Sequence, residues 1–198
     1  MNKEKEIRTI IKDMEIRKKE DGTRSIAGYV VKWNTRSELI WGEFYEKVAK
    51  GAFAKSLEEN TIKALWNHRT DFVLGSTKNA TLRLNEDDIG LIFELDLPNN
   101  SWGNDAFESI SRGDVDGVSF GFFTRNDKWE YLKDEDVYER TLLDVDLKEI
   151  SPTPWPANPS SEVYKRSLDM LPNTREQRHI EQQNILLKRK LQLELELI

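Results

Sequence analysis

The 198-residue chain contains no cysteine, which excludes disulfide bonds, thiolate nucleophiles and cysteine-ligated metal sites. Histidine is almost as scarce, because His68 and His179 are the only two. Long apolar runs are also missing, so the sequence offers no candidate membrane span, and its charged start, residues 1–6, does not have the pattern of a signal peptide. We therefore expect an intracellular protein with no membrane partner and a single realistic general base.

Apolar content is low for a protein built entirely around a packed core. Hydrophobic residues make up 37% of the chain and charged residues 33%, and the mean hydropathy is −0.69. Some of the length is therefore expected to lie outside a core. The formal net charge is −6, and an acidic balance of this kind argues against nucleic acid as a partner.

Charge and proline divide the chain into an acidic body and a slightly basic tail. From Lys165 onward there are 7 basic and 5 acidic residues, whereas the preceding residues contain 23 basic and 31 acidic ones. Four of the six prolines lie within residues 152–159, and such a density ends regular structure. We predict a charged N-terminal segment over 1–23, a folded domain over 24–164 and a tail over 165–198.

Strand patterns dominate the body. Residues 89–97 alternate apolar and polar side chains, as in a half-buried strand, and the turn at 85–88 predicts a hairpin over 80–97. Short helices are predicted at about 51–59 and 104–111. Further predicted strands cover 25–33, 61–66, 118–124, 129–132, 137–143 and 145–150. The predicted fold class is mostly β with peripheral helices (α+β), as an antiparallel barrel that is closed or partly closed.

The tail carries two different apolar patterns. Residues 173–176 can cap a helix that runs toward Lys190, with Ile180 and Leu187 on one face. From Leu191 to Leu197, leucines recur at every second position, which no single helical face accommodates. We interpret the tail as a helical or disordered interaction segment that becomes ordered on a partner; a helical hairpin packed on the body is the alternative.

Two short segments of the body each present one reactive side chain. Residues 64–68 end on His68, and residues 117–122 carry Ser119 in a strand-like run. A serine becomes a good nucleophile when a base removes its proton, and histidine is the usual base near neutral pH. Taken alone, the two residues also fit a surface histidine and an ordinary strand serine.

Six motifs follow one another along the body. They are residues 27–34 (AGYVVKWN), 43–44 (EF) with 50–57 (KGAFAKSL), 65–68 (LWNH) with 73–76 (VLGS), 88–91 (DIGL), 117–122 (GVSFGF), and 147–151 (LKEIS) with 156–159 (PANP). In this order, over about residues 24 to 163, they resemble the motifs of the prohead proteases of tailed bacteriophages, the serine proteases that mature the capsid. The resemblance implies the fold of the related herpesvirus assemblins, a barrel ringed by helices, and no cofactor or metal.

The resemblance also implies site residues. Ser119 corresponds to the family's nucleophile, flanked by Gly117 and Gly121, which leave room for a substrate backbone and an oxyanion pocket. His68 corresponds to the general base. His179 lies in the charged tail and is expected to be solvated.

The third catalytic residue is the least determined. The assemblins use a second histidine, which the body of this chain lacks, so an acid is the natural substitute because it fixes the imidazole tautomer. Glu149 lies in the Glu-Ile-Ser motif and is our choice over Asp146 and Asp144. On a regular strand Glu149 would share a face with Leu147, which is unusual for an acid unless it has a partner.

The implied activity is that of a serine endopeptidase of phage head maturation, acting in the host cell cytoplasm inside the assembling procapsid. Its expected partners are the major capsid protein with its scaffolding segment, and another copy of itself is possible. Self-cleavage is expected, with the tail as a targeting segment that is removed. The alternative is a non-catalytic scaffold or assembly protein on the same barrel, and the intact Ser119 and His68 favour the enzyme.

Overall fold

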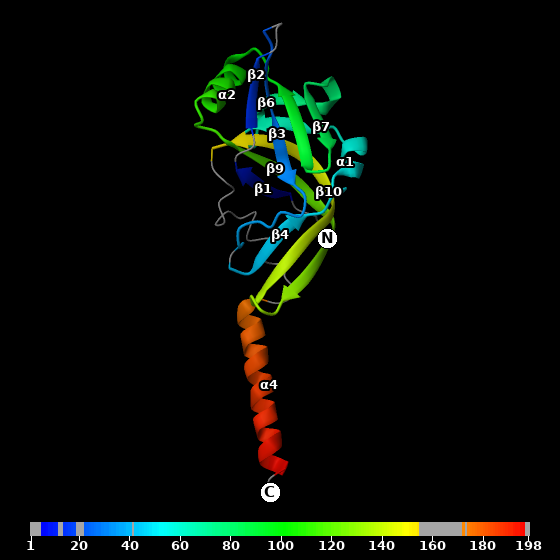
Figure 1. Ribbon diagram of the computed structural model, residues 1–198, viewed down its shortest axis with the longest axis vertical. Helices are drawn as coiled ribbons and strands as arrows, with labels where there is room; N and C mark the ends of the chain where they lie inside the picture. The colour runs from blue at the N-terminus through cyan, green and yellow to red at the C-terminus, as the bar shows by residue number, and fades with distance from the viewer. Residues whose placement is uncertain are drawn as a thin grey trace.

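The structure is a computed structural model that describes residues 5–11, 14–18, 22–40, 42–154, 172 and 174–196. Two β-sheets form the body, and a long helix at the C-terminal end extends away from it (Figure 1).

The larger sheet has six strands and is built around one long hairpin. Along it the strands follow the order β1 (Glu6–Ile11), β9 (Gly117–Leu132), β10 (Val137–Thr153), β5 (Lys63–Trp66) and β6 (Arg69–Ser76), with β4 (Phe44–Val48) also beside β10. Strands β9 and β10 are antiparallel to each other, and β1 is antiparallel to β9 on its other edge. Strands β4 and β5 run parallel to different parts of β10.

The smaller sheet is antiparallel throughout. Its order is β2 (Met14–Lys18), β3 (Arg24–Lys32), β8 (Gly90–Asp96) and β7 (Leu82–Glu86). Between β5–β6 and β7 lies a 3₁₀ turn at Thr77–Asn79.

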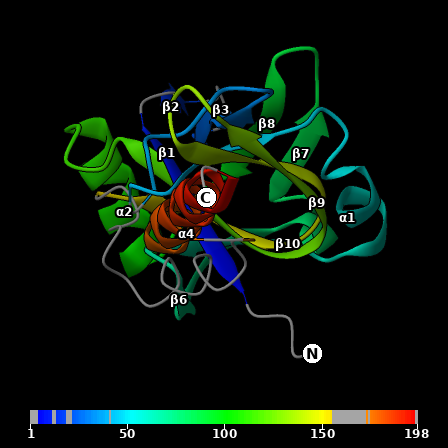
Figure 2. The ribbon, with the colours of Figure 1, turned by 90° about the horizontal axis from the view of Figure 1, so that it is seen from below.

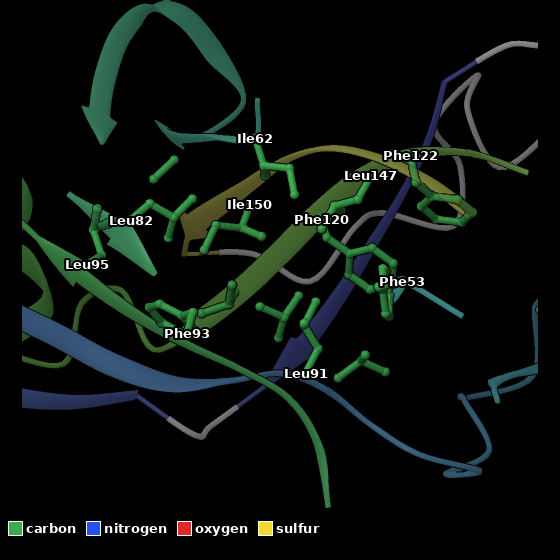
Figure 3. Close-up of a cluster of buried hydrophobic side chains, with 14 of the residues drawn as sticks. Phe53, Ile62, Leu82, Leu91, Phe93, Leu95, Phe120, Phe122, Leu147 and Ile150 are labelled. Atoms are coloured by element: carbon green, nitrogen blue, oxygen red, sulfur yellow. The ribbon is translucent and has the colours of Figure 1, made fainter. Parts of the chain in front are cut away.

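Apolar residues from both sheets meet in one core (Figure 3). In β8 the alternation places Leu91, Phe93 and Leu95 in this core, while the residues between them are only partly buried. Phe120 of β9 and Ile150 of β10, which lie opposite each other, fill it from the larger sheet. The core therefore fixes one face of the β9–β10 hairpin and leaves its other face available for polar groups.

Two short helices flank the body on opposite sides, as the view from below shows (Figure 2). Helix α1 (Ala54–Glu59) is attached to β10 by the buried Ser56, whose hydroxyl donates to Val145 O at 2.5 Å and accepts from Leu147 N at 2.9 Å. Helix α2 (Ser101–Ser111) begins at Asn100, whose side chain accepts from the backbone N–H of the third residue of the helix.

Helix α4 (Arg175–Glu196) contacts the tip of the β9–β10 hairpin through its first turn. The guanidinium of Arg178 lies over the rings of Tyr131 and Tyr138, at 5.2 and 5.0 Å from their centroids. It also donates to the backbone oxygen of Asp136 at 2.9 Å, and its side chain is only 7% exposed. The apolar residues further along the helix, Ile180 and Ile185–Leu187, are exposed.

The predicted fold class, mostly β with peripheral helices, is confirmed, as are the hairpin over 80–97 and the two short helices. Adjacent predicted strands merge into the continuous β9 and β10. The barrel was predicted as antiparallel, and the structure adds two parallel neighbours to β10. Strands β1, β2, β4 and β6 were not predicted, and the first two bring residues before Arg24 into both sheets. The predicted boundary at 164–165 lies outside the described residues.

Candidate active site

His68 occupies the second central position of a two-residue turn. Strands β5 and β6 pair up to Trp66 and Arg69, which leaves Asn67 and His68 to turn the chain. Both have positive φ, 49° and 61°, as a type I′ hairpin turn requires. Asparagine and histidine are among the non-glycine residues that tolerate this conformation best, and its use at a reactive side chain is typical of functional sites.

The turn is fastened to the end of β10. The backbone N–H of Asn67 donates to Pro152 O at 3.1 Å, and that of His68 donates to Ser151 Oγ at 3.2 Å. The side-chain oxygen of Asn67 accepts from Thr153 Oγ1 at 3.0 Å. These three bonds hold the imidazole against the strand that carries Glu149.

Glu149 is a buried carboxylate with three side-chain partners. Its Oε1 lies 2.7 Å from Nδ1 of His68 and 2.8 Å from Nζ of Lys5, and its Oε2 accepts from Ser151 Oγ at 2.6 Å. Only 3% of its side chain is exposed. Burial by itself would raise the pKa of Glu149, but the hydrogen bond and charge of His68, followed by the hydrogen bonds of Lys5 and Ser151, outweigh it and hold the pKa below its usual value. The acid is therefore an anion aligned with the imidazole.

A β-bulge decides which way Glu149 points. The pairing of β10 with β9 shifts between Leu147 and Glu149, so that Leu147 lies opposite Phe122 in the core while Glu149 lies opposite Gly121 on the other face. The expectation that Glu149 shares a face with Leu147 was wrong, because it assumed a regular strand. The expectation that the acid has a partner holds in the structure, and the partner is His68.

Ser119 lies directly opposite Ser151 and therefore on the same face of the hairpin as Glu149. Its side chain is completely buried. Its hydroxyl donates a hydrogen bond of 2.8 Å to the backbone oxygen of Arg8, in the edge strand β1. Among the described residues no hydrogen bond joins Ser119 to His68, whose side chain is 22% exposed.

Gly121 provides space rather than flexibility. A Cβ atom there would lie well inside van der Waals distance of both Oε1 of Glu149 and Cε of Lys5. The absence of a side chain at this position is what lets the carboxylate lie across β9, next to His68. We expected this glycine to make room for a substrate, and in the structure that room holds Glu149 and Lys5.

The rival acids lie elsewhere. Asp146 binds Asn60 at 2.7 Å and Lys148 at 2.8 Å, and Asp144 binds Lys55 at 2.6 Å. Neither contacts His68. In the tail, His179 is 61% exposed, with its Nε2 3.4 Å from Asp136.

Sequence reasoning missed three residues that touch the site. Ser151 was part of the Glu-Ile-Ser motif, so its serine was visible as a candidate partner of the acid. Lys5 and Arg8 gave no signal, because their contacts depend on β1 pairing with a strand more than one hundred positions away.

Within the described part of the chain, no cluster of three or more histidine and carboxylate side chains could hold a metal ion. Of the described helices, none is long and apolar enough to cross a membrane.

A serine on the same sheet face as a buried carboxylate that binds the Nδ1 of a histidine is the arrangement of a serine hydrolase. Comparison with known families agrees with this class: the model of the Caudovirus prohead serine protease family matches residues 12–174. The chain belongs to that family and is a phage prohead serine protease of capsid assembly and maturation. No curated relative matches it.

A solved structure also matches the fold. The capsid assembly protease of bacteriophage T4, gp21, superimposes with a TM-score of 0.53 at 11% sequence identity, over 76% of this chain and 99% of that one. At this identity the similarity concerns the fold alone.

Proposed function

We propose that Ser119, His68 and Glu149 are the catalytic triad of this protease. The observation that carries the proposal is the 2.7 Å contact of His68 Nδ1 with the buried Glu149, on the sheet face that also carries Ser119. With Nδ1 held by the carboxylate, the neutral ring presents Nε2 as the basic nitrogen.

In the working enzyme, Ser119 Oγ attacks the carbonyl carbon of the scissile peptide while His68 accepts the hydroxyl proton. The C–N bond then breaks, and the imidazolium returns that proton to the leaving amine. A water molecule then attacks the acyl carbonyl carbon and gives its proton to His68; the bond from Ser119 Oγ to that carbon breaks, and His68 returns the proton to Oγ. Glu149 stays ionised throughout and stabilises the imidazolium, which its lowered pKa favours.

Ser151 is a positioning residue in this scheme. It donates to Glu149 Oε2 and accepts from the backbone N–H of His68, so one hydroxyl sets both the acid and the turn that carries the base. No other described side chain bonds to both residues.

The substrates we propose are the scaffolding segment of the major capsid protein and the protease itself, cut inside the assembling procapsid in the host cytoplasm. Membership of the prohead protease family supports this substrate class. The exposed apolar residues of α4, Ile180 and Ile185–Leu187, support a tail that binds a partner in the procapsid or a second copy of the chain.

The test is proteolysis of a capsid-derived peptide by purified variants. Ser119→Ala and His68→Ala should each abolish cleavage and leave the thermal unfolding transition in place, and the double variant should be no worse than either single one. His179→Ala is the matched control and should cleave at the rate of the unmodified chain. Cleavage by folded Ser119→Ala would contradict the triad, and a folded chain that neither cleaves the peptide nor reacts with a fluorophosphonate at Ser119, whether unmodified or as any variant, would favour a scaffold protein.

A further inference from the structure

Strand β1 covers the edge of the sheet that carries Ser119. It is the outermost strand next to β9, and its six residues pair antiparallel with Gly117 to Phe122 (Figure 1). Without β1, the backbone N–H and C=O groups on this edge of β9 would be free to pair with another extended peptide.

The strand places its own peptide bond against the serine. Thr9 lies directly opposite Ser119, and the carbonyl of Arg8, which belongs to the Arg8–Thr9 peptide bond, accepts the hydrogen bond of Ser119 Oγ at 2.8 Å. Ser119 is completely buried, with β1 paired along this edge of β9. An incoming peptide therefore cannot bring its carbonyl carbon to Oγ while β1 stays in place.

The same segment also engages the acid. Lys5, one residue before β1, donates to Glu149 Oε1, the oxygen that contacts His68 Nδ1. A cation on this oxygen competes with the imidazolium that forms during catalysis, so the docked segment weakens the stabilisation that Glu149 can give to His68.

Buried charges hold β1 in position. Glu6 and Arg8 are almost fully buried. Arg8 Nη2 binds Glu46 Oε2 at 2.8 Å and Glu6 Oε2 at 2.9 Å, and Arg140 Nη1 binds Glu6 Oε2 at 2.6 Å. Charges buried at this depth must be paired, so the strand is bound at a specific register rather than loosely.

We propose that the edge of β9 over residues 117–122 is the binding site for an extended peptide, and that β1 is its intramolecular occupant, which inhibits the protease until it leaves. The proposal rests on the proposed function, in which Ser119 is the nucleophile. When β1 leaves together with Lys5, the edge of β9, the hydroxyl of Ser119 and Oε1 of Glu149 all become accessible.

Labelling with a fluorophosphonate measures access to Ser119 directly. In this reaction Ser119 Oγ bonds to phosphorus, the P–F bond breaks, fluoride leaves and the hydroxyl proton passes to His68. Arg8→Ala removes one of the buried charges that hold β1 and should speed labelling of the full chain more than tenfold. Arg17→Ala, in the neighbouring exposed strand β2, is the matched control and should leave the rate unchanged.

A tether tests the same point by holding β1 against β9. The chain has no cysteine, so Ile10→Cys with Val118→Cys, or Ile11→Cys with Gly117→Cys, introduces one cross-strand pair at a time. Directly opposite residues have Cα separations within the disulfide range. The oxidised forms should lose labelling at least tenfold relative to the same molecules after reduction, whereas the single-cysteine variants should not respond to reductant.

Equal labelling of oxidised and reduced tethers would overturn the proposal while leaving Ser119 a reactive nucleophile. Slower labelling of a folded Arg8→Ala chain would overturn it as well, since β1 would then support the site. If neither the unmodified chain nor any variant reacts at Ser119 or cleaves a peptide, the proposed function itself is wrong, and this inference falls with it.

Discussion

At the residue scale, Glu149 differs from the rival acids in its contact with the imidazole, since its two oxygens contact His68, Lys5 and Ser151. Glu149→Gln should lower the cleavage rate by about 10²- to 10⁴-fold, because an amide can hold the ring in the wrong tautomer and cannot stabilise the imidazolium. The measurement is kcat with a capsid-derived peptide.

Asp146→Asn and Asp144→Asn are the matched controls. Both acids bind lysine side chains away from His68, so their amides should keep kcat close to that of the unmodified chain. A near-normal kcat for Glu149→Gln combined with a large loss in either control would show that the aspartate replaced in that control, and not Glu149, is the acid of the triad.

Gly121 offers a second prediction at this scale. Its missing side chain makes room for the Glu149 carboxylate and for Lys5, so Gly121→Ala should push Glu149 away from His68 and lower kcat at least tenfold. Adding Lys5→Ala removes the flexible neighbour but not the conflict with Glu149, so the double variant should stay slow. Full recovery in the double variant would show that Lys5 alone was displaced.

At the scale of the elements, the attachment of β1 should depend on pH. Burial by itself would raise the pKa of Glu6, but the hydrogen bond of Arg140 and the charges of Arg8 and Arg140 lower it from 4.5 to about 2. Glu46 and Asp127 are the other charged groups around the same arginines.

Because the folded state lowers this pKa, the stabilisation is complete above pH 4.5 and is lost as the pH falls toward 2, and it amounts to about 3 kcal/mol at most. Urea unfolding of the unmodified chain and of Glu6→Gln should therefore differ most near pH 7 and converge in acid. A difference that stays constant with pH would mean that the Glu6 charge does not stabilise β1.

The sequence predicted individual elements where the pattern was local. The alternation of Leu91, Phe93 and Leu95 was enough for β8, and the helix of the tail was predicted from its cap. Pairing over long distances in sequence carries no local pattern, which is why the parallel neighbours of β10 and the contact of β1 with β9 were not found. Leucines at every second position near the end of the tail predicted that the helix stops before them, whereas the helix continues to Glu196.

In the candidate site, as in the fold, residues within local motifs were predictable and contacts between distant segments were not. Ser119 and His68 were chosen from their motifs, and the structure places them on one hairpin face and on the turn beside it. Glu149 was chosen for a reason that was partly wrong, because the bulge that turns it toward Gly121 cannot be read from composition. Lys5 could be found only once β1 was in place.

At the scale of the whole molecule, catalysis and the tail are predicted to be separable. A chain ending at Tyr164 should cleave an unfolded capsid-derived peptide at close to the full-length rate, because α4 contacts the tip of the β9–β10 hairpin and not the face with Ser119. The same chain should fail to enter procapsids assembled in its presence. Packaging as efficient as that of the full chain, or loss of folding, would contradict a targeting role.

The length of the β9–β10 hairpin sets the distance between Ser119 and the contact with helix α4. Ser119 lies near one end of β9, and Tyr131, which anchors α4, lies near the other, twelve strand positions away. At about 3.3 Å per residue the path between them is about 40 Å. A protease held by its tail on an assembling shell would therefore have its nucleophile at a fixed distance from the hairpin tip that contacts the tail. It would reach polypeptide within a radius that the hairpin and helix α4 set together, and it would spare chains beyond that radius.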